Sequence, residues 1–245
     1  PGFSSNGLDR LQTILNEPTG LELNAAGELQ FNESLNSVVR RVQADGTVIL
    51  VAGMPLVSGY SGNGLPGLQA TFSSPLDAVF TANGDFLIAD SSNGVVRVIM
   101  NGDIVDTLSG NIEGHDVAQE EAAALEAHLG NPRGLTIDTA GKIYTVASSS
   151  PNTIIRTSSG FARAVVGSNP GSGGFNGDGL SGTQTLINFP TDVLFDTTQG
   201  LIFTDTSNNR VRTVTNLAEA SNTPPTAVIV TTPDRLGQAP LKVRF

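Results

Sequence analysis

A proline recurs along this chain at a nearly constant interval. The spacings between Pro18, Pro75, Pro132 and Pro190 are 57, 57 and 58 residues. Each of these prolines leads into an apolar stretch of the same type, such as Asp77-Ala78-Val79-Phe80. A fixed period of this kind indicates a row of similar structural units that bury their apolar faces against one another. The chain is therefore expected to contain four copies of one unit.

Each unit contains the pattern of several short strands. The first two apolar stretches are separated by a turn with a glycine, at Gly27, Gly84, Gly141 and Gly200. A third stretch carries arginine, and a fourth closes the first three units. Repeated groups of four short antiparallel strands predict an all-β fold, a β-propeller of four-stranded blades. The blades are expected at residues 18–53, 75–110, 132–167 and 190–215, with connectors between them.

Two segments of the repeat resemble a known family. The second unit contains Ala89-Asp90-Ser91-Ser92-Asn93 followed by Arg97, and the fourth contains Thr204-Asp205-Thr206-Ser207-Asn208 followed by Arg210 and Arg212. Both are similar to the NHL repeat. A glycine-rich loop at residues 175–179, with weaker copies at 61–64 and 5–7, resembles loops of secreted bacterial members of that family. The resemblance covers roughly residues 2–215 and implies the fold, but one fold can host many functions.

The two ends of the chain suggest that it belongs to a longer protein. Residues 1–217 are assigned to the propeller, and residues 218–245 resemble a linker and the opening of a PKD domain, which has an immunoglobulin-like fold. The segment before Pro18 aligns with the connector before Pro190. Because the resembled family usually has six blades, we expect two to be missing. Alternatively, four blades close on themselves, with residues 227–230 or 241–245 supplying the last outer strand.

The composition limits the classes of partner. The net charge is −10, with two lysines against eleven arginines, which argues against nucleic-acid binding because phosphates require a basic face. The absence of cysteine excludes disulfides and thiolate chemistry. No apolar run is long enough to cross a bilayer. The abundance of small polar residues is typical of a secreted or cell-surface β protein.

The recurring Asp-x-x-Asn motif with a following arginine has two interpretations. Asp90, Asn93 and Arg97 could form a carboxylate site paired with a cation. Short Asp and Asn side chains also hold turns by bonding to the backbone. Because the motif occurs in more than one unit and has decayed to Ala147 in the third, the structural interpretation is favoured.

The innermost strand of each blade carries the candidate metal ligands. Asp77 and Asp192 lie two residues after their prolines, where the other units have glycine. Two carboxylates directed toward one axis could share a calcium ion, which prefers oxygen ligands. The other end of the same strand carries a second polar ring of Asn24, Thr81, Asp138 and Asp196. The alternative is a hydrated channel mouth that binds nothing.

The connector before the third blade differs from the others. Residues 115–129 are rich in Ala, Leu and Glu, which predicts a short rim helix capped by Asp116 with Glu120 in its first turn. The only histidines of the chain, His115 and His128, flank it and lie too far apart on one helix to share an ion. The candidate ligand-binding residues from all connectors are Tyr60, His115, Asp116, Glu120, His128 and Asp178.

These features predict an extracellular binding module whose rim loops and channel mouth meet a protein or a glycan. Protein partners rank first, because sugar sites usually contain aromatic rings and the chain has no tryptophan and only Tyr60 and Tyr144. The alternative is a calcium-dependent lyase or hydrolase with a channel site. Amidating lyases of similar fold rely on strand histidines, which are absent here, and no nucleophile elbow occurs. No catalytic residue is therefore assigned.

Overall fold

The chain folds into four antiparallel β-sheets arranged as four propeller blades, with almost no helix. The structure is a computed structural model that describes residues 2–100, 103–111, 115–116, 121–149, 152–168 and 173–215. The predicted linker and PKD-like segment, 218–245, lies outside the described residues. No helix in the described part of the chain is both long and apolar enough to cross a membrane.

The repeat unit predicted from the sequence is one blade. Blade 1 contains β2 (Pro18–Leu23), β3 (Leu29–Glu33), β4 (Val38–Val42) and β5 (Thr47–Ala52). Blade 2 contains β7 (Pro75–Phe80), β8 (Phe86–Asp90), β9 (Val95–Met100) and β10 (Ile104–Ser109). Blade 3 contains β14 (Pro132–Ile137), β15 (Ile143–Ala147), β16 (Thr153–Ser158) and β17 (Phe161–Val166). The described strands of blade 4 are β18 (Pro190–Asp196), β19 (Gly200–Asp205) and β20 (Arg210–Val214).

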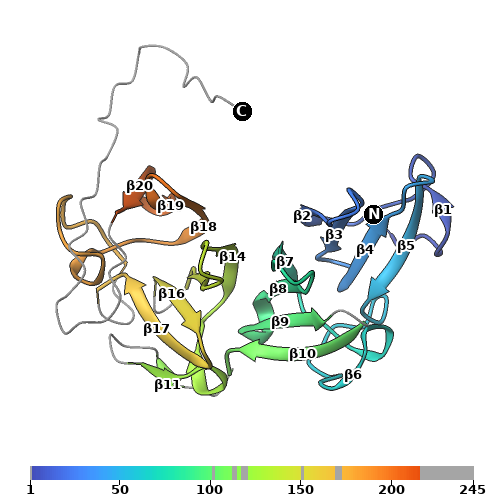
Figure 1. The fold of residues 1–245 in the computed structure, drawn as a ribbon, viewed down its shortest axis with the longest axis horizontal. Helices are drawn as coiled ribbons and strands as arrows, with labels where there is room; N and C mark the ends of the chain where they lie inside the picture. The colour runs from blue at the N-terminus through green and yellow to red at the C-terminus, as the bar shows by residue number, and fades with distance from the viewer. Residues whose placement is uncertain are drawn as a thin grey trace, which may run out of the picture.

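The blades stand side by side along an arc, with blade 1 and blade 4 at its two ends (Figure 1). The proline-led strands β2, β7, β14 and β18 contact one another in this order. On the opposite edge of the first three sheets, the preceding connector adds a short strand: β1 (Leu8–Asp9), β6 (Leu65–Pro66) or β12 (Ala122–Ala123). Connectors are thus part of the sheets and lie at their outer edges.

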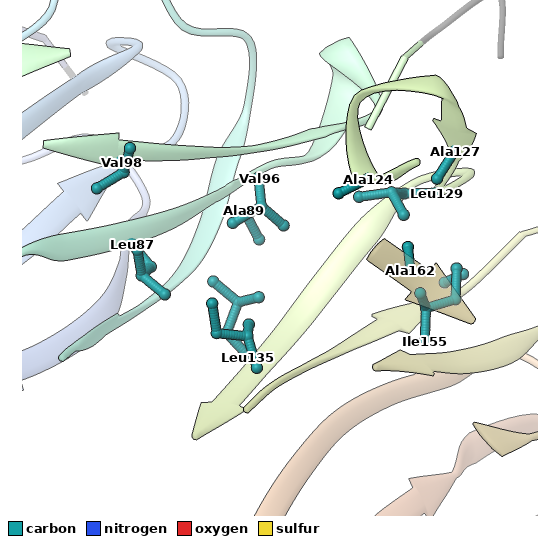
Figure 2. Packing of buried hydrophobic residues seen from close by; sticks show 12 residues of the cluster. Leu87, Ala89, Val96, Val98, Ala124, Ala127, Leu129, Leu135, Ile155 and Ala162 are labelled. Carbon is teal, nitrogen blue, oxygen red and sulfur yellow. The ribbon is translucent and has the colours of Figure 1, made fainter. Parts of the chain in front are cut away.

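The hydrophobic core lies between blades. One cluster joins Val39 and Val51 of blade 1 to Ala78, Phe86 and Ile88 of blade 2. Figure 2 shows the next cluster, in which blade 2 meets blade 3 and its connector through Leu87, Ala89, Val96, Val98, Ala124, Ala127, Leu129, Leu135, Ile155 and Ala162. A third cluster joins blades 3 and 4. Blades 2 and 3 therefore bury apolar residues on both of their faces, and blades 1 and 4 do so on the face toward their neighbour, as expected of a stacked repeat.

Glycine is required where the fourth strand of a blade ends. Gly53, Gly110 and Gly167 have φ between +97° and +104°. A Cβ atom at Gly110 would also lie 2.5 Å from the carbonyl oxygen of Gly94. These glycines follow the ends of β5, β10 and β17, as the repeat alignment predicts.

The predicted rim helix over residues 115–129 is wrong. Its described part contains β11 (His115–Asp116), β12, one turn of 3₁₀-helix η3 (Ala124–Glu126) and β13 (Ala127–His128). The backbone of β12 pairs with β17, and Ala124, Ala127 and Leu129 are buried between blades 2 and 3. Because this packing requires an extended chain, tertiary contacts outweigh the helix propensity of Ala, Leu and Glu.

Candidate ligand-binding site

Three blades are built around a completely buried arginine on the third strand. The guanidinium of Arg40 lies 3.2 Å from Glu33, that of Arg97 lies 3.8 Å from Asp90, and that of Arg212 lies 2.9 Å from Asp205. In blades 2 and 4 the carboxylate also accepts hydrogen bonds from an asparagine three residues later, Asn93 or Asn208. The Asp-x-x-Asn motif therefore has the internal contacts of a structural element.

The arginines also hold the glycine-rich connectors in place. The guanidinium of Arg97 lies 5.0 Å from the ring centre of Tyr60 and donates hydrogen bonds to Ser61 O and Asn63 Oδ1. Arg212 lies 5.2 Å from the Phe175 ring and donates to Gly177 O. An arginine can stack on an aromatic face and donate several hydrogen bonds from its planar group at the same time. The arginine thus fixes each connector loop over its own blade.

Blade 3 has lost both members of the buried ion pair. Ala147 occupies the position of the acid, and the strand register places Ile155 where the other blades have arginine: Thr145 faces Ile155, just as Ile88 faces Arg97. Arg156, the arginine of the third strand in this blade, is one residue further along and lies 3.5 Å from Glu121. Because Ala147 and Ile155 replace the acid and the arginine together, neither of these two positions holds an unpaired buried charge.

A pocket of about 340 Å³ opens between the connector of blade 2 and the connector of blade 3. Its lining residues come from both connectors, from the 3₁₀ turn η2 (Ser91–Asn93) and from β9 and β10: Tyr60, Asn63, Asn93, Val95, Asp106, Thr107, Gly110, Asn111 and Leu125. The side chain of Tyr60 is 51% exposed and that of Leu125 is 55% exposed. The pocket therefore combines accessible apolar surface with hydroxyl, amide and carboxylate groups.

Hydrogen bonds fix the polar groups of this pocket. The hydroxyl groups of Tyr60 and Thr107 are 2.8 Å apart, and Thr107 Oγ1 donates to Asn63 Oδ1. Asn63 Nδ2 donates to the Tyr60 hydroxyl. One oxygen of the Asp106 carboxylate accepts the backbone N–H of Thr107. The Tyr60 ring is thus held in place from the Arg97 side and through its hydroxyl.

The two channel aspartates lie on either side of blade 3. Asp77 Oδ2 accepts a hydrogen bond of 2.7 Å from the backbone N–H of Leu135, which bridges blades 2 and 3. Burial raises the pKa of Asp77 to about 7, with smaller contributions from the nearby charges of Asp192 and Glu22. Asp192 Oδ1 accepts the N–H of its own neighbour Val193. No group of three His, Cys, Asp or Glu side chains suited to a metal ion occurs within the described ranges.

Among the predicted ligand residues whose side chains the structure describes, Asp178 and His128 do not line the Tyr60 pocket. The carboxylate of Asp178 lies 3.3 Å from Arg212 and belongs to the connector of blade 4. His128 lies on β13, where its backbone pairs with that of Asp116, and His115 pairs with Ala127. Glu120 lies outside the described residues. Of the predicted ligand residues with described side chains, Tyr60 is therefore the one in the pocket lining.

Most of the polar residues that line the Tyr60 pocket were not predicted from the sequence. Asp106, Thr107 and Asn111 are absent from the predicted set, although Asp106 and Thr107 place two polar side chains in the middle of a fourth strand. The aligned strand of blade 1, β5, is apolar through Val48-Ile49-Leu50-Val51. This local departure from the repeat is a signal that would have identified the site.

Comparison with known proteins identifies the fold. No protein-family model and no curated protein matches the chain. Among solved structures, a streptogramin B lyase superposes with a TM-score of 0.58 at 12% identity, covering 96% of this chain and 59% of the lyase. The virginiamycin B lyase of Staphylococcus aureus gives 0.58 at 14% identity, covering 94% of this chain and 59% of the lyase.

A third similar structure is an auxiliary nutrient binding protein of Bacteroides thetaiotaomicron, with a TM-score of 0.59 and 16% identity, covering 79% of this chain and 46% of that protein. This chain thus spans less than two thirds of the length of each of these structures. At such low identity the likeness establishes a β-propeller architecture, which hosts unrelated activities.

Proposed function

We propose that this chain is an extracellular, NHL-like propeller module that binds a small, neutral, hydroxyl-rich ligand, such as one sugar unit of a glycan, at the Tyr60 pocket. The observation that carries the proposal is the presence of a half-exposed tyrosine among fixed hydroxyl, amide and carboxylate groups in one pocket. A few convergent polar groups around an apolar surface are typical of small-molecule sites.

The chemistry of the lining favours a neutral ligand. The Asp106 carboxylate accepts hydrogen bonds, as sugar hydroxyls require, and repels an anion. Asn63 and Asn93 carry amide groups that both donate and accept, and Tyr60 offers an amphipathic ring. The volume of about 340 Å³ lies near the lower end of the range for small-molecule pockets, about 300–1,000 Å³. This size suits a single ring better than an extended chain.

The propeller likeness supports the same class of function. One similar structure is described as a nutrient binding protein, which agrees with a binding module at the level of fold. The abundance of small polar residues fits a secreted or cell-surface location. Protein partners, which the sequence alone placed first, are the alternative occupants of the rim.

We expect Tyr60→Ala to weaken saccharide binding at least about tenfold, because removing an aromatic wall of a pocket costs more than about 1.4 kcal/mol. Isothermal titration with methyl glycosides of glucose, galactose, mannose and N-acetylglucosamine measures the loss. Tyr60→Phe keeps the ring over Arg97 and tests the hydroxyl alone.

Phe161→Ala is the matched control, because Phe161 is 50% exposed and lies in blade 3 outside the pocket lining. Equal binding by wild type and Tyr60→Ala would refute the saccharide site. If none of the four glycosides binds, capture of a protein partner that depends on Tyr60 would assign the rim to protein recognition instead.

A further inference from the structure

Two arginines face each other on the two outer strands of blade 3. Arg156 of β16 and Arg163 of β17 are directly opposite in the register of these neighbouring strands, so their side chains lie on the same face of the sheet (Figure 1). Like charges in this arrangement repel each other and destabilise a sheet. A compensating negative charge is therefore expected beside them.

The described residues supply only part of that compensation. The side chain of Arg156 is 9% exposed, and it lies 3.5 Å from Glu121, which is 48% exposed. Arg163 forms no ion pair within the described part of the chain. The Nε atoms of both arginines are buried and have no hydrogen-bond partner there. The two guanidinium groups thus form a single ion pair, with a half-exposed carboxylate.

Blade 1 shows how the position of Arg156 is balanced when the blade itself supplies the acceptors. The register aligns Arg156 with Arg41, because Tyr144 faces Arg156 as Gln30 faces Arg41. Arg41 Nε donates a hydrogen bond of 2.8 Å to Gln30 Oε1, and the guanidinium lies 3.9 Å from the Glu28 carboxylate. Arg41 therefore has both a neutral acceptor and a carboxylate on its own sheet.

Blade 3 carries a lysine at the position of that carboxylate. The backbone N–H of Lys142 donates to Asp138 Oδ1, just as that of Glu28 donates to Asn24 Oδ1. Lys142 thus replaces an acid with a base beside the arginine. The other oxygen of Asp138 accepts the Tyr144 hydroxyl, so this carboxylate is engaged within its own hairpin.

The fourth strand adds a second basic residue to the same face. Arg163 takes the position that Ile49 has in blade 1 and Asp106 has in blade 2. In blade 2, the position of Lys142 is held by Asp85. The corresponding face is therefore neutral in blade 1, acidic in blade 2 and basic in blade 3.

We propose that this face of blade 3 binds an oxyanion, the sulfate or phosphate group of a ligand or the free ion, between Arg156 and Arg163. A guanidinium presents planar, paired N–H donors that match the oxygens of such a group, and Lys142 adds positive charge. Glu121 competes with the anion for Arg156. None of these residues lines the Tyr60 pocket, so the site is independent of the proposed saccharide binding.

Isothermal titration of the 245-residue chain with inorganic phosphate, inorganic sulfate and methyl phosphate tests this site. Sodium chloride keeps the ionic strength constant, so that general screening does not contribute. We expect saturable binding of one anion per chain at millimolar concentration or below. Binding of methyl phosphate as well as phosphate would show that the site accepts the group on a larger molecule, and binding of the free ions alone would assign it to an inorganic ion. The absence of saturable binding by all three overturns the proposal.

Substitutions taken from the other blades make the test specific. Arg156→Val introduces the residue of blade 2, and Arg163→Ile introduces that of blade 1, so both variants should fold and keep the circular dichroism spectrum. Each should weaken anion binding at least about tenfold, because charge-assisted hydrogen bonds are lost. Arg41→Val is the matched control and should bind as the wild type does. Unchanged affinity in both blade 3 variants, or an equal loss in the control, overturns the proposal.

Two further measurements locate the anion. Glu121→Gln should bind it more tightly than the wild type, because the competing carboxylate is gone, and weaker binding would contradict the site. With ¹³C-labelled tyrosine, phosphate should shift the ring resonances of Tyr144, which faces Arg156 in the register, and leave those of Tyr60 in place. A shift of Tyr60 without a shift of Tyr144 would place the anion elsewhere and overturn the proposal.

Discussion

Replacing Arg212 with methionine is expected to lower the free energy of unfolding by about 3–5 kcal/mol, because it leaves a buried carboxylate without its cation. Arg212 and Asp205 are both completely buried and lie 2.9 Å apart. The arginine also donates to Leu186 O and Gly177 O, which lie in the connector before blade 4. Urea denaturation followed by circular dichroism measures the loss.

A double variant distinguishes the loss of the ion pair from the loss of packing by the Arg212 side chain. Asp205→Asn in the Arg212→Met background should restore a large part of the stability, because the neutral amide can still accept the backbone N–H of Asn188. Arg10→Met, at an exposed arginine, should change the free energy by no more than about 0.5 kcal/mol. A double variant less stable than Arg212→Met alone would contradict the assignment of this pair. Blade 3, with Ala147 and Ile155, already shows that a blade can form without it.

Replacing Asp77 with asparagine should increase stability at pH 8 and leave it nearly unchanged at low pH. Burial raises the pKa of Asp77 from 3.8 to about 7. At pH values between these two pKa values, the folded state holds a proton that the unfolded state has lost. The wild-type protein therefore loses stability as the pH rises from the lower value to the higher. The asparagine carries no charge and keeps an acceptor for Leu135 N–H. The gain at pH 8 is expected to be about 2–4 kcal/mol.

Urea titrations at a series of pH values test the direction of this pH dependence of stability. The difference between Asp77→Asn and wild type should grow between the ordinary pKa of 3.8 and about 7 and then level off. Burial also raises the pKa of Asp90 to about 7, so Asp90 further lowers the stability of the wild type as the pH rises. Because the Asp77→Asn variant keeps Asp90, this contribution cancels in the difference between the two proteins. Glu126→Gln, at an exposed carboxylate, is the control. A stability difference that shrinks as the pH rises would contradict the buried environment of Asp77.

The architecture could be predicted from the sequence because each blade is one copy of the sequence repeat. The proline period, the turn glycines and the alternating apolar residues each reappear in four units, so that one unit checks another. The predicted strands of the first three blades are confirmed, including the fourth strands that end at Gly53, Gly110 and Gly167. The connector before blade 3 was mispredicted because a single segment with good helix formers has no second copy to correct it.

The site was predicted only in part because it lies where two units meet. Tyr60 is distinctive in composition, but its neighbours Thr107 and Leu125 come from the blade and from the next connector. Their proximity depends on how Arg97 holds the loop, and the sequence shows only the motif in which this arginine occurs. The polar residues at Asp106 and Thr107 are a local signal, whereas the pocket itself is a product of tertiary packing.

Binding of a saccharide beside Tyr60 can be detected directly, because the two tyrosines of the chain lie in different environments. Tyr60 is 51% exposed in the pocket, whereas Tyr144 is 1% exposed in the core between blades 3 and 4. With ¹³C-labelled tyrosine, titration of the four methyl glycosides should shift the ring resonances of Tyr60 in a saturable way. The resonances of Tyr144 should stay in place as an internal control. Unchanged Tyr60 resonances at saturating glycoside, or equal shifts of both tyrosines, would contradict saccharide binding beside Tyr60.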